Sequence, residues 1–211
     1  MTVADKTGQD PKRPYRSAVR QQSAADTRRR IAVAARDLFA EDGFSGTTVA
    51  TIAARAGVAT PTVYATFGSK GAIVRALLAQ MEHDADNADW VERIAQEPNP
   101  HAKVEAFVKW TTVLFSSSKV LIQTANGAAA DPAMNDLRKE GDRHRRQALR
   151  GLIGLLIQSN ALSAGLNEEV ALDRAWMLTG IELYLSATDG CNWTDEQYQQ
   201  WLTALLHQQL L

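Results

Sequence analysis

Apolar residues return every three or four positions from about residue 26 onward, which is the period of an amphipathic helix. The first such segment, residues 26–42, places Ile31, Ala34, Ala35, Leu38 and Phe39 on one face. Asp26 is a suitable N-cap for it, and Gly43 suits the left-handed residue that follows many helices. The pattern therefore predicts a helix from about residue 26 to residue 42.

Two very short helical segments follow between Thr47 and Lys70. We expect Thr48 to cap the first, which turns Val49, Ile52, Ala53 and Ala56 inward and ends at Gly57. We expect Thr60 to cap the second, with Pro61 at its first helical position, where a missing N–H costs nothing. Val63 and Phe67, four residues apart, are its predicted buried pair. Ser69 then starts a longer helix.

Helices of about two turns are marginal in isolation because nucleation is unfavourable. These two must be braced by the helices before and after them. A braced pair joined by a tight turn that contains Gly57 is the helix-turn-helix arrangement, whose second helix enters a DNA groove. An ordinary corner between two helices of a bundle is the structural alternative.

The remainder also has helical periodicity, and no strand-like alternation or internal repeat is visible. Predicted helices cover residues 100–118, a short segment from about Lys119, residues 132–160, a segment of about 168–188 capped by Asn167, and residues 194–211. Thr194 and Gln197 have the spacing of a capping box. We predict an all-α fold with an N-terminal three-helix DNA-binding domain and a larger helical domain.

Charge is distributed unevenly along the chain. Residues 1–75 contain 12 basic and 6 acidic side chains, whereas residues 76–211 contain 11 basic and 18 acidic ones. A basic front joined to an acidic body is typical of a protein whose front binds a polyanion. Residues 1–23 are polar, rich in Lys and Arg and without apolar periodicity, which indicates a disordered basic arm. A merely solvated tail is the alternative.

Several function classes lack their sequence signals. No apolar run approaches the roughly 20 residues that span a bilayer, and no secretory signal is visible, so we expect a cytoplasmic protein without a membrane partner. The single Cys191 cannot form an internal disulfide. We find no phosphate loop, dinucleotide motif, zinc motif or catalytic triad context, and we expect no metal, no cofactor and no enzyme activity.

The residues around the short helices resemble a known family. The stretch "RDLFAEDGFSGTTVATIAARAGVATPTVYATFGSKGAIVRALL", Arg36 to Leu78, is similar to the DNA-binding domain of TetR-type transcriptional repressors. It has the "GF" turn, the "T-x-x-x-I-A-x-x-A-G-V" helix and the "Y-x-x-F-x-S-K" junction. This resemblance sets the expected domains at residues 1–23 (basic arm), 24–70 (helix-turn-helix domain) and 71–211 (effector-binding and dimerisation domain).

The resemblance also implies which residues touch a double-stranded DNA operator. They are Thr47, Thr48, Thr60, Pro61, Thr62, Tyr64, Thr66 and Lys70, and we add Arg28 from the basic segment. Thr47, Thr48, Tyr64 and Lys70 are expected on phosphates, and the others on bases or the adjoining backbone. Tyr64 could instead be a core aromatic whose hydroxyl faces solvent.

The chain departs from the family pattern at two positions. Thr66 stands where the family often has His, and Gly71 stands where it often has a charged residue. The outward face of the second short helix has no Arg, Lys, Asn or Gln, so direct base readout should be weak.

The larger domain is implied to form a homodimer and to hold a small effector. The final two predicted helices, about 168–188 and 194–211, would make the dimer interface. Candidate effector contacts are Phe107, Trp110, Phe115, Met134, His144, Trp176 and Tyr184. Each of these could equally be an ordinary core or helix-face residue. The expected function is a repressor that binds a palindromic operator and is released by a small hydrophobic or amphipathic molecule. An all-α enzyme and a sequence-independent nucleoid-type DNA binder remain the alternatives.

Overall fold

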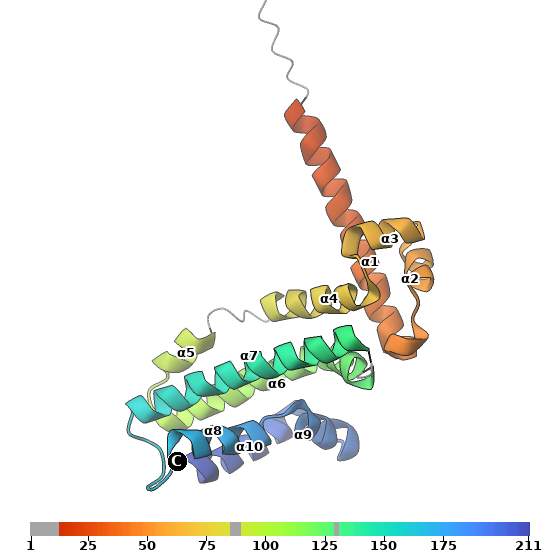
Figure 1. Cartoon of the computed structure of the whole chain (residues 1–211). Helices are drawn as coiled ribbons and strands as arrows, with labels where there is room; N and C mark the ends of the chain where they lie inside the picture. Colours follow the sequence, from red (N-terminus) through yellow and green to blue (C-terminus); the bar gives the residue numbers. More distant parts are fainter. Residues whose placement is uncertain (1–12, 85–89, 129–130) are drawn as a thin grey trace, which may run out of the picture. The chain divides into compact units, whose positions relative to one another are not determined.

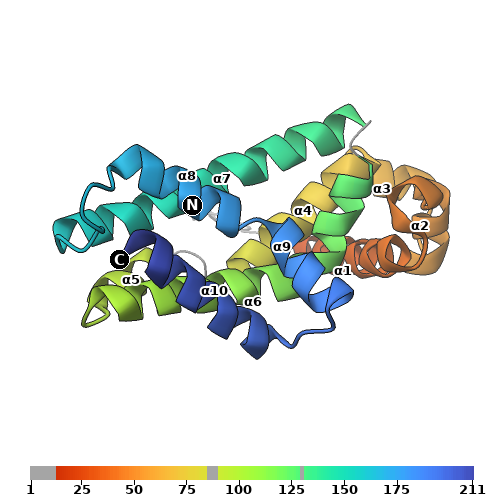
Figure 2. The same cartoon turned by 90° about the horizontal axis from the view of Figure 1, so that it is seen from below.

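The computed structural model describes residues 13–84, 90–128 and 131–211. Within these ranges the chain consists of helices and connecting turns (Figures 1 and 2). The predicted all-α class is confirmed. The chain divides into two compact units, Met1–Ile73 and Val74–Leu211, close to the predicted boundary after residue 70. The first is called the head below, and the second the body.

The head begins with one long helix, α1 (Arg13–Gly46). The expectation of a disordered arm is wrong for residues 13–23, which are helical, while residues 1–12 lie outside the described residues. This stretch contains three arginines and two glutamines, and Pro14 falls in the first turn, so the local propensity favours a helix despite the missing apolar face. Figure 1 shows the first part of α1 extending beyond α2 and α3. Gly43 has a positive φ of 68° and breaks the helix near its end.

Three shorter helices complete the head and lead into the body: α2 (Val49–Ala56), α3 (Thr60–Phe67) and α4 (Lys70–Asp84). Thr48 caps α2 as predicted, in a capping box with Thr51, and Gly57 ends it in the left-handed region. Thr60 is not the cap of α3: Ala59 occupies that place without a side-chain bond, so α3 begins one residue early. The Ser69 hydroxyl accepts the Ala72 amide at the start of α4, as expected.

The head is held together by a small apolar core. Ile31, Phe39 and Ile52 are at most 2% exposed, and Val63 joins them from α3. Phe67, predicted to be buried with Val63, is only half-buried, and its ring lies under the Arg28 guanidinium at 4.2 Å. Burying these side chains is what stabilises α2 and α3, each of which has only eight residues.

The body starts with α5 (Trp90–Gln96), α6 (Pro100–Gly127) and α7 (Pro132–Gln158). Helix α5 was not predicted. The expected break near Lys119 is also wrong, because α6 is one helix of 28 residues. The three consecutive serines at residues 116–118 stay helical, and the Ser117 hydroxyl donates to the Leu114 carbonyl. Asn99 and Asp131 cap α6 and α7, each followed by a proline in the first turn.

The C-terminal part comprises α8 (Glu168–Leu178), α9 (Ile181–Leu185), a π-helical turn η1 (Ser186–Gly190) and α10 (Asp195–Leu210). The caps predicted at Asn167 and Thr194 are confirmed. The single helix expected at 168–188 is instead interrupted at Gly180, whose extended backbone (ψ 150°) separates α8 from α9. Figures 1 and 2 show α8 and α10 beside each other, with α6 and α7 forming the long layer of the body.

The body core is formed where α6, α7, α8 and α10 meet. Phe107, Leu152, Ala175, Leu202 and Leu206 are at most 2% exposed within one apolar cluster. Among the described helices, none combines the length and apolar character needed to cross a bilayer.

Candidate functional site

Helix α3 presents an exposed face to solvent. Pro61, Tyr64 and Ala65 are exposed, and Tyr64 is 52% accessible. Tyr64 is therefore not the core aromatic of the alternative interpretation. Thr60, Thr62 and Thr66 are half-buried along the edges of the same helix. The face combines hydroxyls, a proline and a methyl group, without a charged side chain.

A groove runs between this helix and the front of α1. We call it the α1–α3 groove, and its lining residues are Arg20, Ser23, Ala24, Ala25, Thr27, Arg28, Thr62, Ala65 and Thr66. Two arginines and several hydroxyls lie along it, and none of these described residues is acidic. The nearby Asp26 pairs with Arg29 instead, at 3.2 Å. Cationic and hydroxyl groups of this kind are the ones that contact DNA phosphates.

Arg28 lies in this groove, as the sequence suggested, but it also has a local role. Its guanidinium donates to the Thr66 carbonyl at 3.0 Å and stacks on Phe67. These contacts fix α3 against α1 near the C-terminal end of α3. The Thr66 hydroxyl donates to the Thr62 carbonyl at 2.7 Å, so its methyl group is the part left for an outside partner.

Thr47 is not placed to contact DNA. It is 1% exposed, and its hydroxyl lies 2.8 Å from the Gly43 carbonyl and 3.1 Å from the Leu38 carbonyl. The break at Gly43 leaves carbonyls at the end of α1 without helical partners, and Thr47 satisfies them. Thr48 remains exposed at the start of α2, although its hydroxyl is engaged in the capping box.

Lys70 is also committed inside the head. Its ammonium donates to the Phe44 carbonyl at 2.6 Å and the Thr47 carbonyl at 2.8 Å, and it lies 4.0 Å above the Phe44 ring. A cation is favoured where a helix ends because the last carbonyls carry partial negative charge. Lys70 therefore has a structural role inside the head, and its contact with a phosphate stays a prediction.

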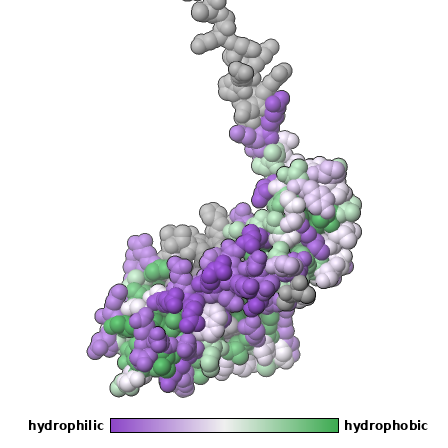
Figure 3. Space-filling model, in the orientation of Figure 1, coloured by the Kyte–Doolittle hydropathy of each residue, from purple (hydrophilic) through white to green (hydrophobic). Residues whose placement is uncertain are grey.

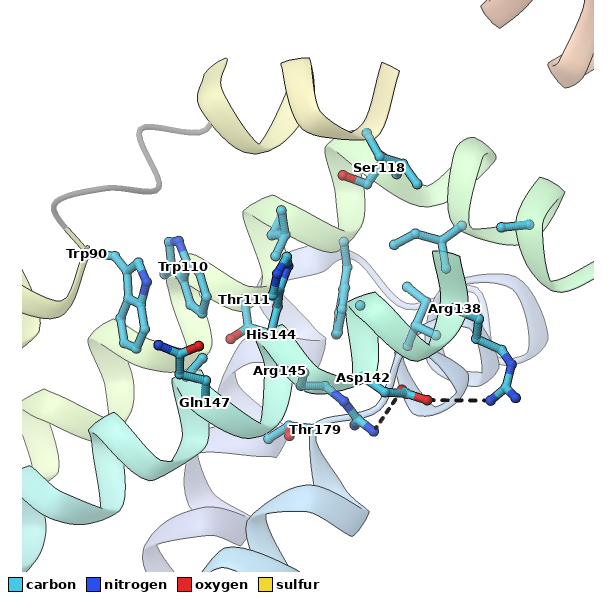
Figure 4. A pocket seen from close by; sticks show the side chains of 18 of the residues that line it. Trp90, Trp110, Thr111, Ser118, Arg138, Asp142, His144, Arg145, Gln147 and Thr179 are labelled. Atoms are coloured by element: carbon cyan, nitrogen blue, oxygen red, sulfur yellow. Dashed lines mark hydrogen bonds and ion pairs between the residues drawn. The ribbon is translucent and has the colours of Figure 1, made fainter. Parts of the chain in front are cut away.

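The body contains a cavity of about 570 Å³. Its walls come mainly from α6 and α7, with contributions from α4, α5 and the α8–α9 junction. Figure 4 shows the side chains of these helices facing the space between them. The cavity residues of α6 extend from Phe107 to Asn126, which corresponds to about 28 Å along a helix that rises 1.5 Å per residue. The cavity is therefore elongated.

One end of the cavity is aromatic. The Trp90 and Trp110 rings are stacked at 4.3 Å with 14° between their planes, and Phe107 lies 5.9 Å from Trp90. Gly151 on α7 leaves room for this stack, since a Cβ there would stand 3.7 Å from the Trp90 ring. Flat apolar groups pack well against such a wall.

Charged side chains lie along α7 toward the other end. Asp142 sits between Arg138, at 3.4 Å, and Arg145, at 3.9 Å (Figure 4). Arg145 also donates to the Trp176 carbonyl and stacks on the Trp176 ring at 3.5 Å. Burial lowers the pKa of Arg145, because desolvation disfavours the charged form. The body thus joins an apolar end to a polar stretch in one cavity.

The cavity includes some of the predicted effector contacts and leaves out others. Phe107, Trp110, Phe115 and His144 line it. Met134 is buried elsewhere on α7, and Trp176 is separated from the cavity by Arg145. Tyr184 lies behind Phe115, with its hydroxyl donating to Asp195 at 2.7 Å. These three residues do not line this cavity, because residue type alone does not tell which side of a helix a side chain occupies.

Sequence reasoning missed Trp90, Arg138, Asp142 and Arg145. The last three follow the i, i+4, i+7 spacing of one helix face, the same face as Leu137, Gly141 and Ala148. That spacing is a usable signal. From the sequence, the run of Arg143, Arg145 and Arg146 beside His144 is interpreted as a solvated face that could also attract an acidic effector. Trp90 had a weaker signal, since α5 has only seven residues.

Residues 31–77 match the family model of the bacterial regulatory proteins of the tetR family. This part of the chain is a DNA-binding domain of the tetR type. The matched segment contains all of α2 and α3 together with parts of α1 and α4, so the sequence resemblance is confirmed for the TetR-type domain. Proteins of this type are DNA-binding transcription regulators, and the exposed α3 belongs to the matched segment.

Solved structures share the fold over most of the chain. NalD of Pseudomonas aeruginosa, the secondary repressor of the MexAB-OprM multidrug efflux pump, has a TM-score of 0.71 at 18% identity, covering 90% of this chain and 98% of that one. FadR of Bacillus subtilis in complex with stearoyl-CoA has a TM-score of 0.68 at 20% identity, covering 84% and 96%. The SmeT–triclosan complex has a TM-score of 0.70 at 16% identity, covering 88% and 91%. Such low identities establish the common fold. No curated protein sequence matches the chain.

Proposed function

We propose that this TetR-type protein is a repressor that binds a palindromic operator as a homodimer and leaves it when a small hydrophobic or amphipathic molecule occupies the body cavity. The observation that supports DNA binding most directly is the exposed face of α3, flanked by the α1–α3 groove with its arginines and hydroxyls. A helix of this kind fits a major groove, while the groove beside it suits the sugar–phosphate backbone.

The homodimer is supported by exposed apolar side chains on the C-terminal helices. Val170 and Met177 on α8 are 42% and 73% exposed, and Trp201 on α10 is 38% exposed. Figure 3 shows hydrophobic residues reaching the surface among polar ones over the part of the body where α8 and α9 lie. A two-fold pairing of α8 and α10 would cover such residues and present two copies of α3 to successive half-sites.

The effector site is proposed in the cavity between α6 and α7. Its volume falls within the range of small-molecule sites, and its lining is mostly apolar with a few polar groups. Two relatives of this fold were solved with stearoyl-CoA and with triclosan bound. To release DNA, the effector must bind the DNA-incompetent arrangement more tightly than the DNA-bound one.

Fluorescence anisotropy with labelled duplexes tests this function. The duplexes would come from the intergenic DNA beside the gene for this protein, with a scrambled duplex of equal length and composition as control. We expect the intergenic duplex to bind at least about a thousandfold more tightly than the scrambled one at physiological salt, as specific regulators do. Equal affinity for both duplexes would contradict specific repression and favour the nucleoid-type alternative.

A further inference from the structure

We infer that the body cavity binds an elongated amphipathic monoanion, with its apolar end on the Trp90–Trp110 stack and its anionic group on Arg138 and Arg145. This inference names the effector class and so rests on the proposed function. It depends on the shape of the cavity, on the order of apolar and charged groups along it, and on the arrangement of one carboxylate between two guanidinium groups.

The first step is the polarity of the cavity along its length. Helices α6 and α7 are consecutive and antiparallel, so the start of α6 lies beside the end of α7. Accordingly, Trp90, Phe107 and Trp110 occur together with Gly151 at one end, where no charged side chain of the described residues lines the wall. Leu137 and Arg138 on α7 line the other end, with Asn126 on α6. A ligand that fills this length would have unlike ends.

The second step is the sign of the charge. Arg138 and Arg145 share the single carboxylate of Asp142 over 3.4 Å and 3.9 Å. Charge-assisted hydrogen bonds are usually about 2.7–2.9 Å long, so both contacts are loose. This group of three carries one excess positive charge. Glu182 from α9 also lines the cavity, and its carboxylate acts on Arg145 through its charge. The residue is exposed, so water screens this interaction.

The guanidinium of Arg145 is already held in a fixed position in which it can bind an anion. Its guanidinium is held by the Trp176 carbonyl at 3.1 Å and by the Trp176 ring at 3.5 Å, so little conformational freedom is lost when a ligand binds. Desolvation of this cation is only partly offset by the carboxylates of Asp142 and Glu182. An incoming carboxylate, sulfate or phosphate monoester would supply the missing counter-charge.

Ser118 adds a polar group to the cavity wall. The residue belongs to α6, lines the cavity and is 2% exposed. A serine hydroxyl can donate a hydrogen bond to an acceptor atom of a bound molecule.

Calorimetric titration of the full chain, without DNA, tests the inference with three probes of equal chain length: decanoate, decanol and decyltrimethylammonium. We expect decanoate to bind about tenfold more tightly than decanol, since a charge-assisted bond adds roughly that much affinity. The cation should bind most weakly. Decanol binding as tightly as decanoate, or tightest binding of the cation, would overturn the inference.

Two substitutions and a control locate the anionic end. Arg138→Gln should weaken decanoate about tenfold and leave decanol unchanged, by the same estimate. Asp142→Asn removes the competing carboxylate and should strengthen decanoate binding. Arg143→Gln, an exposed arginine of the same helix that does not line the cavity, is the matched control. If the Asp142→Asn variant keeps its fold by circular dichroism but binds decanoate more weakly, the inference about the anionic end is contradicted. If the ligand titrations give the expected results but the protein does not bind operator DNA, only the proposed function is contradicted.

Discussion

At the scale of single residues, buried polar groups of the body serve the fold. Lys103 is 7% exposed, and its ammonium donates to the carbonyls of Ala95 at 2.7 Å, Glu97 at 2.6 Å and Ile94 at 3.3 Å. These carbonyls belong to the last turn of α5 and the residue after it, where helical partners become scarce; the Ile94 carbonyl also accepts the Glu97 amide at 3.2 Å. One side chain of α6 therefore terminates α5 and holds it in place.

Lys103→Met should destabilise the protein by about 2 kcal/mol, because the α5 carbonyls would remain buried without a donor. Urea unfolding at neutral pH measures the change. Lys109→Met, an exposed lysine of the same helix, is the control and should stay within about 0.5 kcal/mol of the native protein. An equal effect of the two substitutions would show that Lys103 contributes only helix propensity.

Burial and the hydrogen bond to Asp195 raise the pKa of Tyr184 to about 12. The neutral phenol is the form that the fold favours, so its contribution is complete below the ordinary tyrosine pKa of 10.0 and is lost as the pH rises toward 12. Tyr184→Phe should remove part of this alkaline loss. Unfolding measured across that window, with Tyr64→Phe as the control for loss of a tyrosine hydroxyl, tests it. Unchanged alkaline loss in Tyr184→Phe would contradict the assignment.

The sequence was least informative about single polar side chains. Thr47 and Lys70 have the residue types of phosphate contacts, yet both satisfy carbonyls near the end of α1. The break in α1 at Gly43 leaves these carbonyls without helical partners. Thr47 and Lys70 reach them only because the chain folds back, so their contacts depend on the tertiary structure. Position along the chain cannot distinguish a hydroxyl or ammonium that faces DNA from one that caps a neighbouring helix.

At the scale of helices, local chemistry predicted much of what the structure contains. The caps at Thr48, Asn167 and Thr194 and the left-handed Gly57 lie where their residue types indicated. Breaks were harder to predict: the serines near Lys119 leave α6 intact, whereas Gly180 interrupts the segment expected as one helix. Serine is tolerated inside a packed helix, so packing overrode propensity there.

The front of α1 should act as a phosphate contact of the head. Arg20→Gln removes one cation from the α1–α3 groove and should lower the slope of log affinity against log salt by about one. Anisotropy titrations at several salt concentrations measure that slope. The matched control is Arg36→Gln on the same helix, an exposed arginine that pairs with Asp37 and is not part of the groove. An unchanged slope for Arg20→Gln would mean that this part of α1 does not reach DNA.

At the scale of the whole molecule, the sequence predicted two helical domains but not the composition of the cavity. Periodicity tells which residues share a helix face, whereas a cavity depends on which faces of several helices converge. Phe107, Trp110 and Phe115 were within reach because α6 is long and regular. Trp90 and Arg145 became cavity residues only through the packing of α5 and α8 around α7.

The proposed homodimer gives the prediction at the scale of the whole molecule. Met177→Asp places a charge on an exposed apolar position of α8 and should convert the dimer to monomers while leaving the fold intact, because a charge is costly at a buried interface. Analytical ultracentrifugation measures the association state. Val113→Asp on α6, 50% exposed in the same unit, controls for the added charge. Retention of the dimer by the Met177 variant would exclude this face of α8 from the interface.

The Lys70 ammonium ties the first turn of α4 to the two carbonyls that bracket the turn before α2. Lys70 therefore couples the two segments. If the first turn of α4 is displaced, either the residues before α2 move with it or two short hydrogen bonds to a charged donor break. Acetylation of this one amine would cancel the charge and release the tie, leaving the outer face of α3 chemically unaltered.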